Sequence, residues 1–170
     1  ILAGEVALRR HQPAAAIEHW QRIVAQVPEY APLVLDRLAR TLEAEGRRPE
    51  ALALLKRSLL EHPSIDTLDL NVRWVRDWQG AEAAETLLRE ELKRHASLLG
   101  FERLLEIRGG PNQADPELTL LRGLIQTHAR KLARYRCSQC GFRSREFYWN
   151  CPGCTSWDSY PPRRIEELEV

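Results

Sequence analysis

The sequence of 170 residues contains no methionine, even at position 1, and only four cysteines, all beyond residue 136. It has no run of about 18 apolar residues that would span a bilayer and no cleavable signal segment. Ile1 reads as the middle of a helix, so we expect a longer protein whose upstream anchor or targeting segment is outside this sequence. The net charge of +1 argues against a general nucleic-acid binder.

The motifs of common enzyme classes are also missing. The sequence has no Gly-rich phosphate loop, no His-Glu-x-x-His and no nucleophile elbow. The five histidines do not cluster, and His62 and His95 fall near expected helix ends, where they would have a structural role. These absences favour binding over catalysis, and we predict that the protein is not an enzyme.

The cysteines form two Cys-x-x-Cys hooks separated by ten residues. In each hook the two intervening residues let the backbone turn back, so that both sulfurs point at one ion. Two hooks supply the four thiolates of a closed tetrahedral zinc site, and no histidine stands beside them to leave an open catalytic position. The predicted metal ligands are Cys137, Cys140, Cys151 and Cys154.

Two other interpretations of the cysteines remain open: a pair of disulfides and a redox Cys-x-x-Cys. Disulfides need an oxidising compartment, and a redox pair needs only one hook. For the metal site we expect Gly141 and Gly153 to adopt left-handed backbone angles, and Phe147-Tyr148-Trp149 to form a strand leading into the second hook. The aromatic residues of this segment are expected to form its small core, and some of them to pack on the helical repeats: Phe142, Phe147, Tyr148, Trp149, Trp157 and Tyr160.

A weak internal repeat occupies residues 1–107. Ala16 and Trp20 recur 35 residues later as Ala51 and Leu55, and again 33 residues further on as Ala84 and Leu88. A small residue followed four positions later by a bulky one is the mark of paired helices in a repeat of about 34 residues. The fold class predicted is mainly α: a tetratricopeptide-type helical repeat solenoid with a small C-terminal zinc-ribbon or rubredoxin-like module built on four cysteines.

The pattern of apolar residues and turn residues predicts helices at about 13–27, 32–45, 49–62, 65–78, 81–95 and 97–107. A last helix, opened by Asp115-Pro116-Glu117, should run to about Arg134 with an apolar face of Leu118, Leu121, Ile125 and Leu132. The predicted domains are repeats at 1–107, a loop and final helix at 108–134, a four-cysteine metal-binding ribbon at 135–160 and a tail at 161–170.

Two segments carry a resemblance to a known family: Cys137-Ser-Gln-Cys140-Gly141-Phe142, and the run from Tyr148 through Cys151-Pro-Gly-Cys154 to Trp157. Following such repeats and a final helix, they closely resemble lipopolysaccharide assembly protein B. The resemblance covers the whole chain. It implies the cytoplasmic part of a bacterial inner-membrane protein with one N-terminal transmembrane helix, and it places the family's metal ligands on the four cysteines.

The resemblance further implies an adaptor that works with the membrane protease FtsH to promote degradation of the deacetylase LpxC, and so restrains lipopolysaccharide synthesis. Two departures stand out. The anchor and several earlier repeats are missing, and the hooks lie closer together than in true rubredoxins. The second departure favours a structural ion, zinc or alternatively iron, over electron transfer.

Stacked helix pairs build a concave surface whose outward polar residues contact partners. Residues at equivalent repeat positions, together with Arg76, are therefore predicted to bind a protein partner, although an acid four residues before an arginine is also an ordinary intrahelical pair. These residues are Asp36, Arg40, Asp69, Arg73, Arg76 and Glu102. Two alternative functions remain: a rubredoxin-like electron-transfer module on a repeat scaffold, and a nucleic-acid-binding ribbon.

Overall fold

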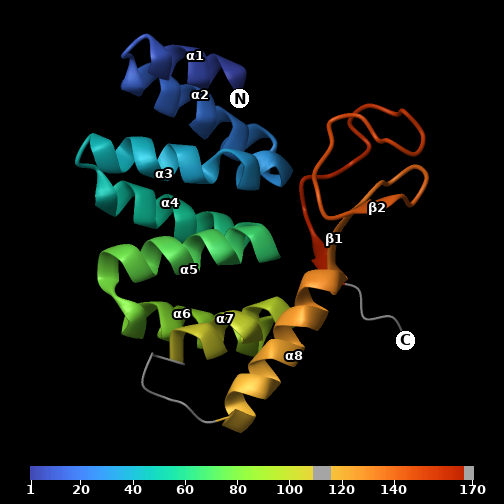
Figure 1. The fold of residues 1–170 in the computed structure, drawn as a ribbon. Helices are drawn as coiled ribbons and strands as arrows, with labels where there is room; N and C mark the ends of the chain where they lie inside the picture. The colour runs from blue at the N-terminus through green and yellow to red at the C-terminus, as the bar shows by residue number, and fades with distance from the viewer. Residues whose placement is uncertain (109–115, 167–170) are drawn as a thin grey trace. The chain divides into compact units, whose positions relative to one another are not determined.

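A computed structural model describes residues 1–108 and 116–166 (Figure 1). The described chain is mainly helical, with a small sheet in its C-terminal part, which confirms the predicted fold class. It divides into two compact units, Ile1–Asn71 and Val72–Val170, which part within the fifth α-helix. The four segments predicted from the sequence remain a prediction.

The first unit consists of helices that run back and forth beside one another (Figure 1). Its elements are α1 (Leu2–Arg9), α2 (Pro13–Gln26), the 3-10 helix η1 (Pro28–Leu33), α3 (Leu35–Ala44), α4 (Arg48–Glu61) and the first part of α5 (Ile65–Gln79). The predicted helices agree with these bounds to within a few residues. The short helix η1 was not expected; it takes up the start of the segment predicted as 32–45.

The repeat pairs are the centres of packing. Ala16 and Trp20, their counterparts Ala51 and Leu55, and the third pair in the second unit are all fully buried. The small residue leaves room for the neighbouring helix, and the bulky residue one turn later fills the remaining space. A closer approach occurs where α1 meets α2, because a Cβ on Gly4 would clash with the indole ring of Trp20. The repeat read from the sequence is therefore a packing repeat.

The ends of equivalent helices also repeat. Val27, His62 and His95 follow α2, α4 and α6 with nearly the same φ, at −139°, −136° and −136°. Each donates its backbone N–H to the carbonyl four residues earlier, so each completes the last helical turn. The two histidines thus stand at helix ends, as predicted. Gly46, at φ +73°, makes the turn between α3 and α4.

The second unit continues with the rest of α5 and ends in the ribbon. Its further elements are α6 (Ala81–Arg94), α7 (Leu98–Arg108), α8 (Pro116–Leu132), β1 (Ala133–Arg136), β2 (Arg143–Ser144) and β3 (Ile165–Glu166). The sheet is antiparallel in the order β2-β1-β3. Strand β1 pairs Tyr135 with Ser144 on one side and Arg134 with Ile165 on the other. Because β1 follows α8 without a linker, the final helix carries the ribbon directly.

Three sequence predictions in this unit are corrected. The last helix ends at Leu132, since Ala133 already belongs to β1. The segment Phe147-Tyr148-Trp149 is not a strand; a single antiparallel bridge joins Asn150 to Trp157 after it. Leu121, expected on the apolar face of α8, is 47% exposed. The predicted cap Asp115 lies outside the described residues. Within 1–108 and 116–166, no helix has both the length and the apolar character needed to cross a membrane.

Candidate metal centre

The two hooks share one backbone pattern. In the first, Cys137 N–H donates to the Phe142 carbonyl at 2.9 Å, and Gly141 N–H donates to the Cys137 carbonyl at 3.0 Å. In the second, Cys151 N–H donates to the Ser156 carbonyl at 3.0 Å, and Thr155 N–H donates to the Cys151 carbonyl at 2.8 Å. Each hook is thus a tight turn that begins at its first cysteine. The repetition gives both turns the same capacity to present two sulfurs.

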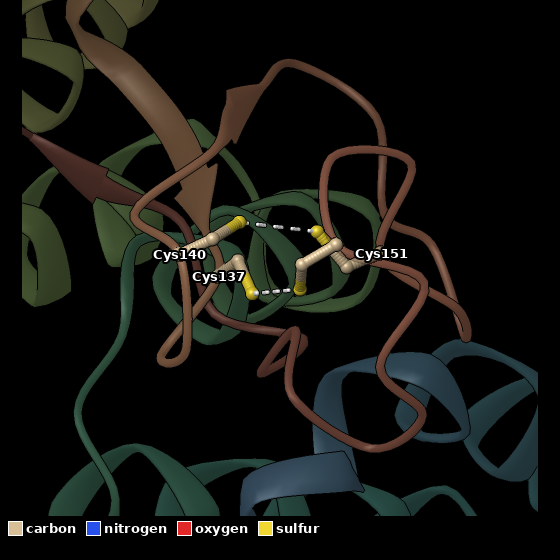
Figure 2. A group of neighbouring side chains, drawn as sticks. Cys137, Cys140 and Cys151 are labelled. Atoms are coloured by element: carbon tan, nitrogen blue, oxygen red, sulfur yellow. Dashed lines mark hydrogen bonds between the residues drawn. The ribbon is translucent and has the colours of Figure 1, made fainter.

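The four sulfurs form one cluster, with all Sγ atoms within 4.8 Å of one another. Two sulfur pairs join the hooks: Cys140 to Cys151 at 3.6 Å, which Figure 2 shows, and Cys137 to Cys154 at 3.8 Å. A disulfide requires about 2.05 Å between sulfurs, so the cysteines are free thiols in this structure. The disulfide interpretation is therefore wrong for this structure.

The spacing fits a single tetrahedral ion. Four sulfurs at about 2.3 Å from a central zinc lie about 3.8 Å from one another, since that is the edge of such a tetrahedron. The two measured pairs, at 3.6 and 3.8 Å, match that edge. Four cysteines in the ribbon can therefore hold one metal ion, as predicted. Bonds from sulfur to iron are of similar length, so this geometry does not choose between the two metals.

The sulfurs differ in exposure. Cys137 and Cys151, the first residues of their hooks, are 1% and 0% exposed. Cys154 is half-buried and Cys140 is exposed. One side of the cluster is thus sealed by the protein, and the other lies near solvent. An ion at the centre would be held from the inside by the two buried thiolates.

The pKa values show why the cluster favours a cation. The hydrogen bond between the side chains of Cys137 and Ser159 is the main cause that lowers the pKa of Cys137 to about 6. A backbone hydrogen bond from Phe142 favours the Cys140 thiolate, but lost hydration and the three neighbouring cysteines outweigh it and raise that pKa to about 12. The side chain of Ser156 lowers the pKa of Cys154. The raised pKa of Cys140 keeps a proton on that thiol at neutral pH, so binding of a metal ion by Cys140 would release a proton.

Ser159 is a contributor that no motif in the sequence singles out. It is buried, and its hydroxyl lies 3.4 Å from Cys137 Sγ and 3.0 Å from the Ser156 carbonyl. Its single hydroxyl proton can turn to the sulfur once Cys137 is ionised. Its carbonyl accepts the backbone N–H of Ser138 at 2.7 Å, which ties the end of the ribbon to the first hook. Ser159 lies outside both hooks, and its distance from them in the sequence matches no known motif, so the sequence alone does not identify it.

The two hook glycines act for different reasons. Gly141 has φ +74°, the left-handed conformation that was expected. Gly153 does not adopt that conformation, so the expectation there is wrong. Instead, a Cβ at Gly153 would lie 3.1 Å from Phe142 Cβ and 3.3 Å from Cys140 Sγ. The second hook therefore needs glycine to let the two hooks come together.

The ribbon has a small aromatic core built on its sulfurs. Tyr160 is 1% exposed and packs with Cys137 and Cys151, and Tyr135, Phe147 and Tyr148 surround them. Tyr160 Oη donates to the Tyr135 carbonyl at 3.2 Å, and burial raises the pKa of its phenol. The predicted core is confirmed for Phe147, Tyr148 and Tyr160. Phe142, Trp149 and Trp157 differ, because they are 39%, 50% and 74% exposed.

Among the predicted partner-binding residues, Asp36 and Arg40 lie on α3 and form an intrahelical ion pair at 3.0 Å. Asp69, on the first part of α5, is half-buried. In the second unit, Arg73 is exposed and lies 5.9 Å from the centre of the Trp74 ring, and Arg76 is exposed. Glu102 is only 4% exposed, so it was wrong to expect an outward side chain there. A partner-binding role for the set remains a prediction.

The fold and the site together define a tetratricopeptide-repeat protein that carries a rubredoxin-type metal-binding domain. A family model described as a rubredoxin metal binding domain matches residues 135–162, and one described as a tetratricopeptide repeat matches residues 7–68. Lipopolysaccharide assembly protein B of Escherichia coli (strain K12) is 28% identical over 96% of this chain and 43% of that protein. The protein of that name from Haemophilus influenzae is 23% identical over 98% and 43%.

These matches confirm the resemblance found in the sequence: the chain is similar to lipopolysaccharide assembly protein B over nearly its whole length. It spans less than half the length of these curated relatives. A shorter match joins it to DNA repair protein RadA of Streptococcus pyogenes, at 38% identity over 42 residues, which are only 8% of that protein. That match is too short to carry a function.

Proposed function

We propose that this chain is the scaffold part of a membrane-tethered adaptor that restrains lipopolysaccharide synthesis by promoting proteolysis of the deacetylase LpxC by FtsH. The adaptor would work at the cytoplasmic face of the bacterial inner membrane, held by an anchor outside this sequence. The observation that carries the proposal is the pairing of packed helical repeats with a four-sulfur cluster, in a chain similar to lipopolysaccharide assembly proteins over 96% of its length.

Two features support a scaffold. Helical repeats of this type present extended surfaces for protein partners. The ribbon supplies four sulfurs to one ion, a closed shell that leaves no position for a substrate, as in structural zinc sites. Zinc is the proposed metal. Because β1 continues α8 directly, an ordered ribbon would fix the end of the helical part.

A second candidate is an electron-transfer module, favoured by the exposure of Cys140 at a rubredoxin-type site. This function needs iron, with a visible absorbance that bleaches reversibly on reduction. A colourless protein that contains one zinc per chain when purified from its own cells would remove this candidate. A coloured, iron-containing protein with reversible bleaching would replace the proposal.

The adaptor function is tested in cells with the full-length protein that contains this chain. The half-life of LpxC is measured by immunoblot after protein synthesis is stopped, with the protein present and depleted. We expect depletion to lengthen the half-life severalfold, and LpxC and FtsH to co-purify with the protein from membranes. An unchanged half-life together with no co-purification would overturn the proposal.

The predicted contact surface is tested by exchanging charges within one helix. The double variant D36R/R40D keeps an intrahelical pair but reverses its direction on α3. We expect it to reduce co-purification if this surface binds a partner. The matched control is E18R/R22E, because Glu18 and Arg22 form an exposed pair of the same spacing on α2. Equal co-purification with both variants would show that Asp36 and Arg40 serve the helix alone.

A further inference from the structure

The four cysteines of the cluster are not equally open to reagents in solution. Cys140 is exposed and Cys154 is half-buried, while Cys137 and Cys151 are buried. Gly153 stands beside the exposed cysteine, because a Cβ added to that glycine would lie 3.3 Å from Cys140 Sγ. Glycine has no side chain, so this position of the second hook leaves the sulfur uncovered. A small reagent in solution therefore meets Cys140 first.

A second sulfur is close enough to react with Cys140 once it has been oxidised. Cys151 Sγ lies 3.6 Å from Cys140 Sγ, across the two hooks (Figure 2). A disulfide bond is about 2.05 Å long, so the two sulfurs must approach each other by about 1.5 Å. A movement of that size can be shared between two short turns. The exposed cysteine of the first hook is thus paired with a buried cysteine of the second.

We infer that Cys140 is an oxidation site, at which a peroxide converts the metal-binding ribbon into a metal-free form with a disulfide bond between the hooks. The inference rests on the zinc site of the proposed function, and on neither LpxC nor FtsH. Cys140 is the sulfur that reacts with the peroxide, and Cys151 is the sulfur that completes the disulfide. The bond therefore joins the two hooks, and not the two cysteines of one Cys-x-x-Cys.

The reaction needs hydrogen peroxide and no other co-reactant. Cys140 is a thiolate in the metal-loaded ribbon, and its Sγ attacks one peroxide oxygen. An S–O bond forms, the O–O bond breaks and hydroxide leaves, so the sulfur is oxidised to a sulfenic acid. The Cys151 thiolate then attacks Cys140 Sγ, an S–S bond forms, the S–O bond breaks and a second hydroxide leaves. Two thiolates and one peroxide thus give one disulfide and two hydroxide ions, which take protons from the buffer.

The reaction removes two of the four ligands from the cluster. Cys137 and Cys154 remain, and two sulfurs do not make the closed shell of a structural site. Because metal binding supplies much of the stability of so small a ribbon, the ribbon should lose its order when the ion leaves. The first unit, Ile1–Asn71, contains no cysteine and should keep its structure. A thiol reductant and zinc should restore the ribbon, since thiol–disulfide exchange is reversible.

The first test treats the zinc-loaded 170-residue chain with an equimolar amount of hydrogen peroxide in the absence of oxygen. A chromophoric chelator measures the released zinc. The remaining thiols are alkylated, and tandem mass spectrometry of the unreduced digest identifies the linked cysteines. We expect release of zinc with a bond between Cys140 and Cys151, and faster hydrogen exchange in the ribbon but not in the first unit. Retained zinc, or a bond between Cys137 and Cys140 within one hook, would overturn the inference.

The second test uses two histidine variants to identify the sulfur that reacts first. Cys140→His should still bind zinc, because three cysteines and one histidine also form a structural zinc shell, but it removes the exposed sulfur. The matched control is Cys154→His, which makes the same change at the same position of the other hook and keeps Cys140. We expect peroxide to release zinc from Cys140→His at least about tenfold more slowly than from the control, since oxidation follows the exposure of the thiolate.

The outcomes of the two tests decide the inference separately from the adaptor function. Equal release rates from the two variants would overturn the assignment of Cys140. If either variant fails to bind zinc, the disulfide found in the wild type decides: a first bond between Cys140 and Cys151 supports the inference, and any other first bond overturns it. Both tests use the purified chain, whereas the adaptor function is tested by the half-life of LpxC in cells, so either can fail without the other.

Discussion

In the first unit, Ile1–Asn71, most of the fully buried residues are aliphatic side chains at helical spacing, joined by Trp20 and the polar Asn71. In the ribbon, the buried residues are Cys137, Cys151, Ser159, Tyr160 and Pro162, and the strands are only two to four residues long. The repeat helices can therefore be stabilised by apolar burial alone. So short a ribbon buries too little apolar surface, and an ion must supply much of its stability. Four predictions test this difference, beginning with the largest effect.

Cys151→Ser removes a ligand that is 0% exposed. We expect loss of the metal and of hydrogen-exchange protection in the ribbon, while the first unit keeps its protection. The effect should be large, since structural zinc binding is worth on the order of 10 kcal/mol in small domains. Gln139→Ala, at an exposed position between two ligands, is the control. An unchanged metal content and melting temperature would refute a structural role for the ion.

Leu55→Ala should have the reverse pattern. Leu55 is fully buried at the centre of the second repeat, so its truncation should cost about 2–5 kcal/mol of unfolding free energy in the first unit. The bound metal should stay at one ion per chain. Leu60→Ala, on the same helix but 71% exposed, should change stability by less than about 0.5 kcal/mol. Urea unfolding followed by circular dichroism measures both, and equal effects would contradict the assigned core.

Gly153→Ala tests the contact between the hooks. The added Cβ would lie 3.1 Å from Phe142 Cβ, so the hooks must separate slightly, at a cost of about 1–3 kcal/mol. We expect weaker zinc binding in competition with a chromophoric chelator. Pro152→Ala, at an exposed neighbouring position, should bind zinc almost as well as the wild type. Equal affinities for the two variants would show that the hooks have room for a side chain.

Tyr160→Phe tests the aromatic core with the smallest change. Loss of the hydrogen bond to the Tyr135 carbonyl should cost about 0.5–1.5 kcal/mol of ribbon stability. Because burial raises the pKa of Tyr160, its contribution is complete below the ordinary tyrosine value of about 10 and is lost as the pH rises through the raised value. The wild type should thus lose ribbon stability in strong alkali, and the phenylalanine variant should lose less. Parallel losses would contradict the assignment.

The helical part could be predicted closely because its signals are local. Spacing alone identified Ala16, Trp20 and their counterparts, and all are buried. The buried side of α8 could not be chosen in the same way, because leucines occur on more than one side of that helix. Leu121 is exposed while Ala129 is buried. The prediction that the Glu102 side chain faces outward was wrong for a related reason, since a polar residue at a repeat position does not show which side of the helix is buried.

At the metal site, the hooks could be predicted because two Cys-x-x-Cys turns have few other uses. The supporting residues could not. Ser159 contacts Cys137 only because the ribbon folds back on itself. Gly153 is needed because the first hook packs closely against it, and no pattern in the sequence indicates that contact. The segment 147–149 has the composition of a strand, but its aromatic side chains go to the small core and to solvent without strand pairing.

X-ray absorption at the metal edge of the purified protein tests the central claim most directly, since it reports the identity, number and distance of the atoms around the ion. We predict zinc with four sulfur neighbours at about 2.3 Å and no nitrogen or oxygen neighbour. A shell with fewer than four sulfurs, or a protein without metal whose sulfurs are bonded in pairs, would contradict the account.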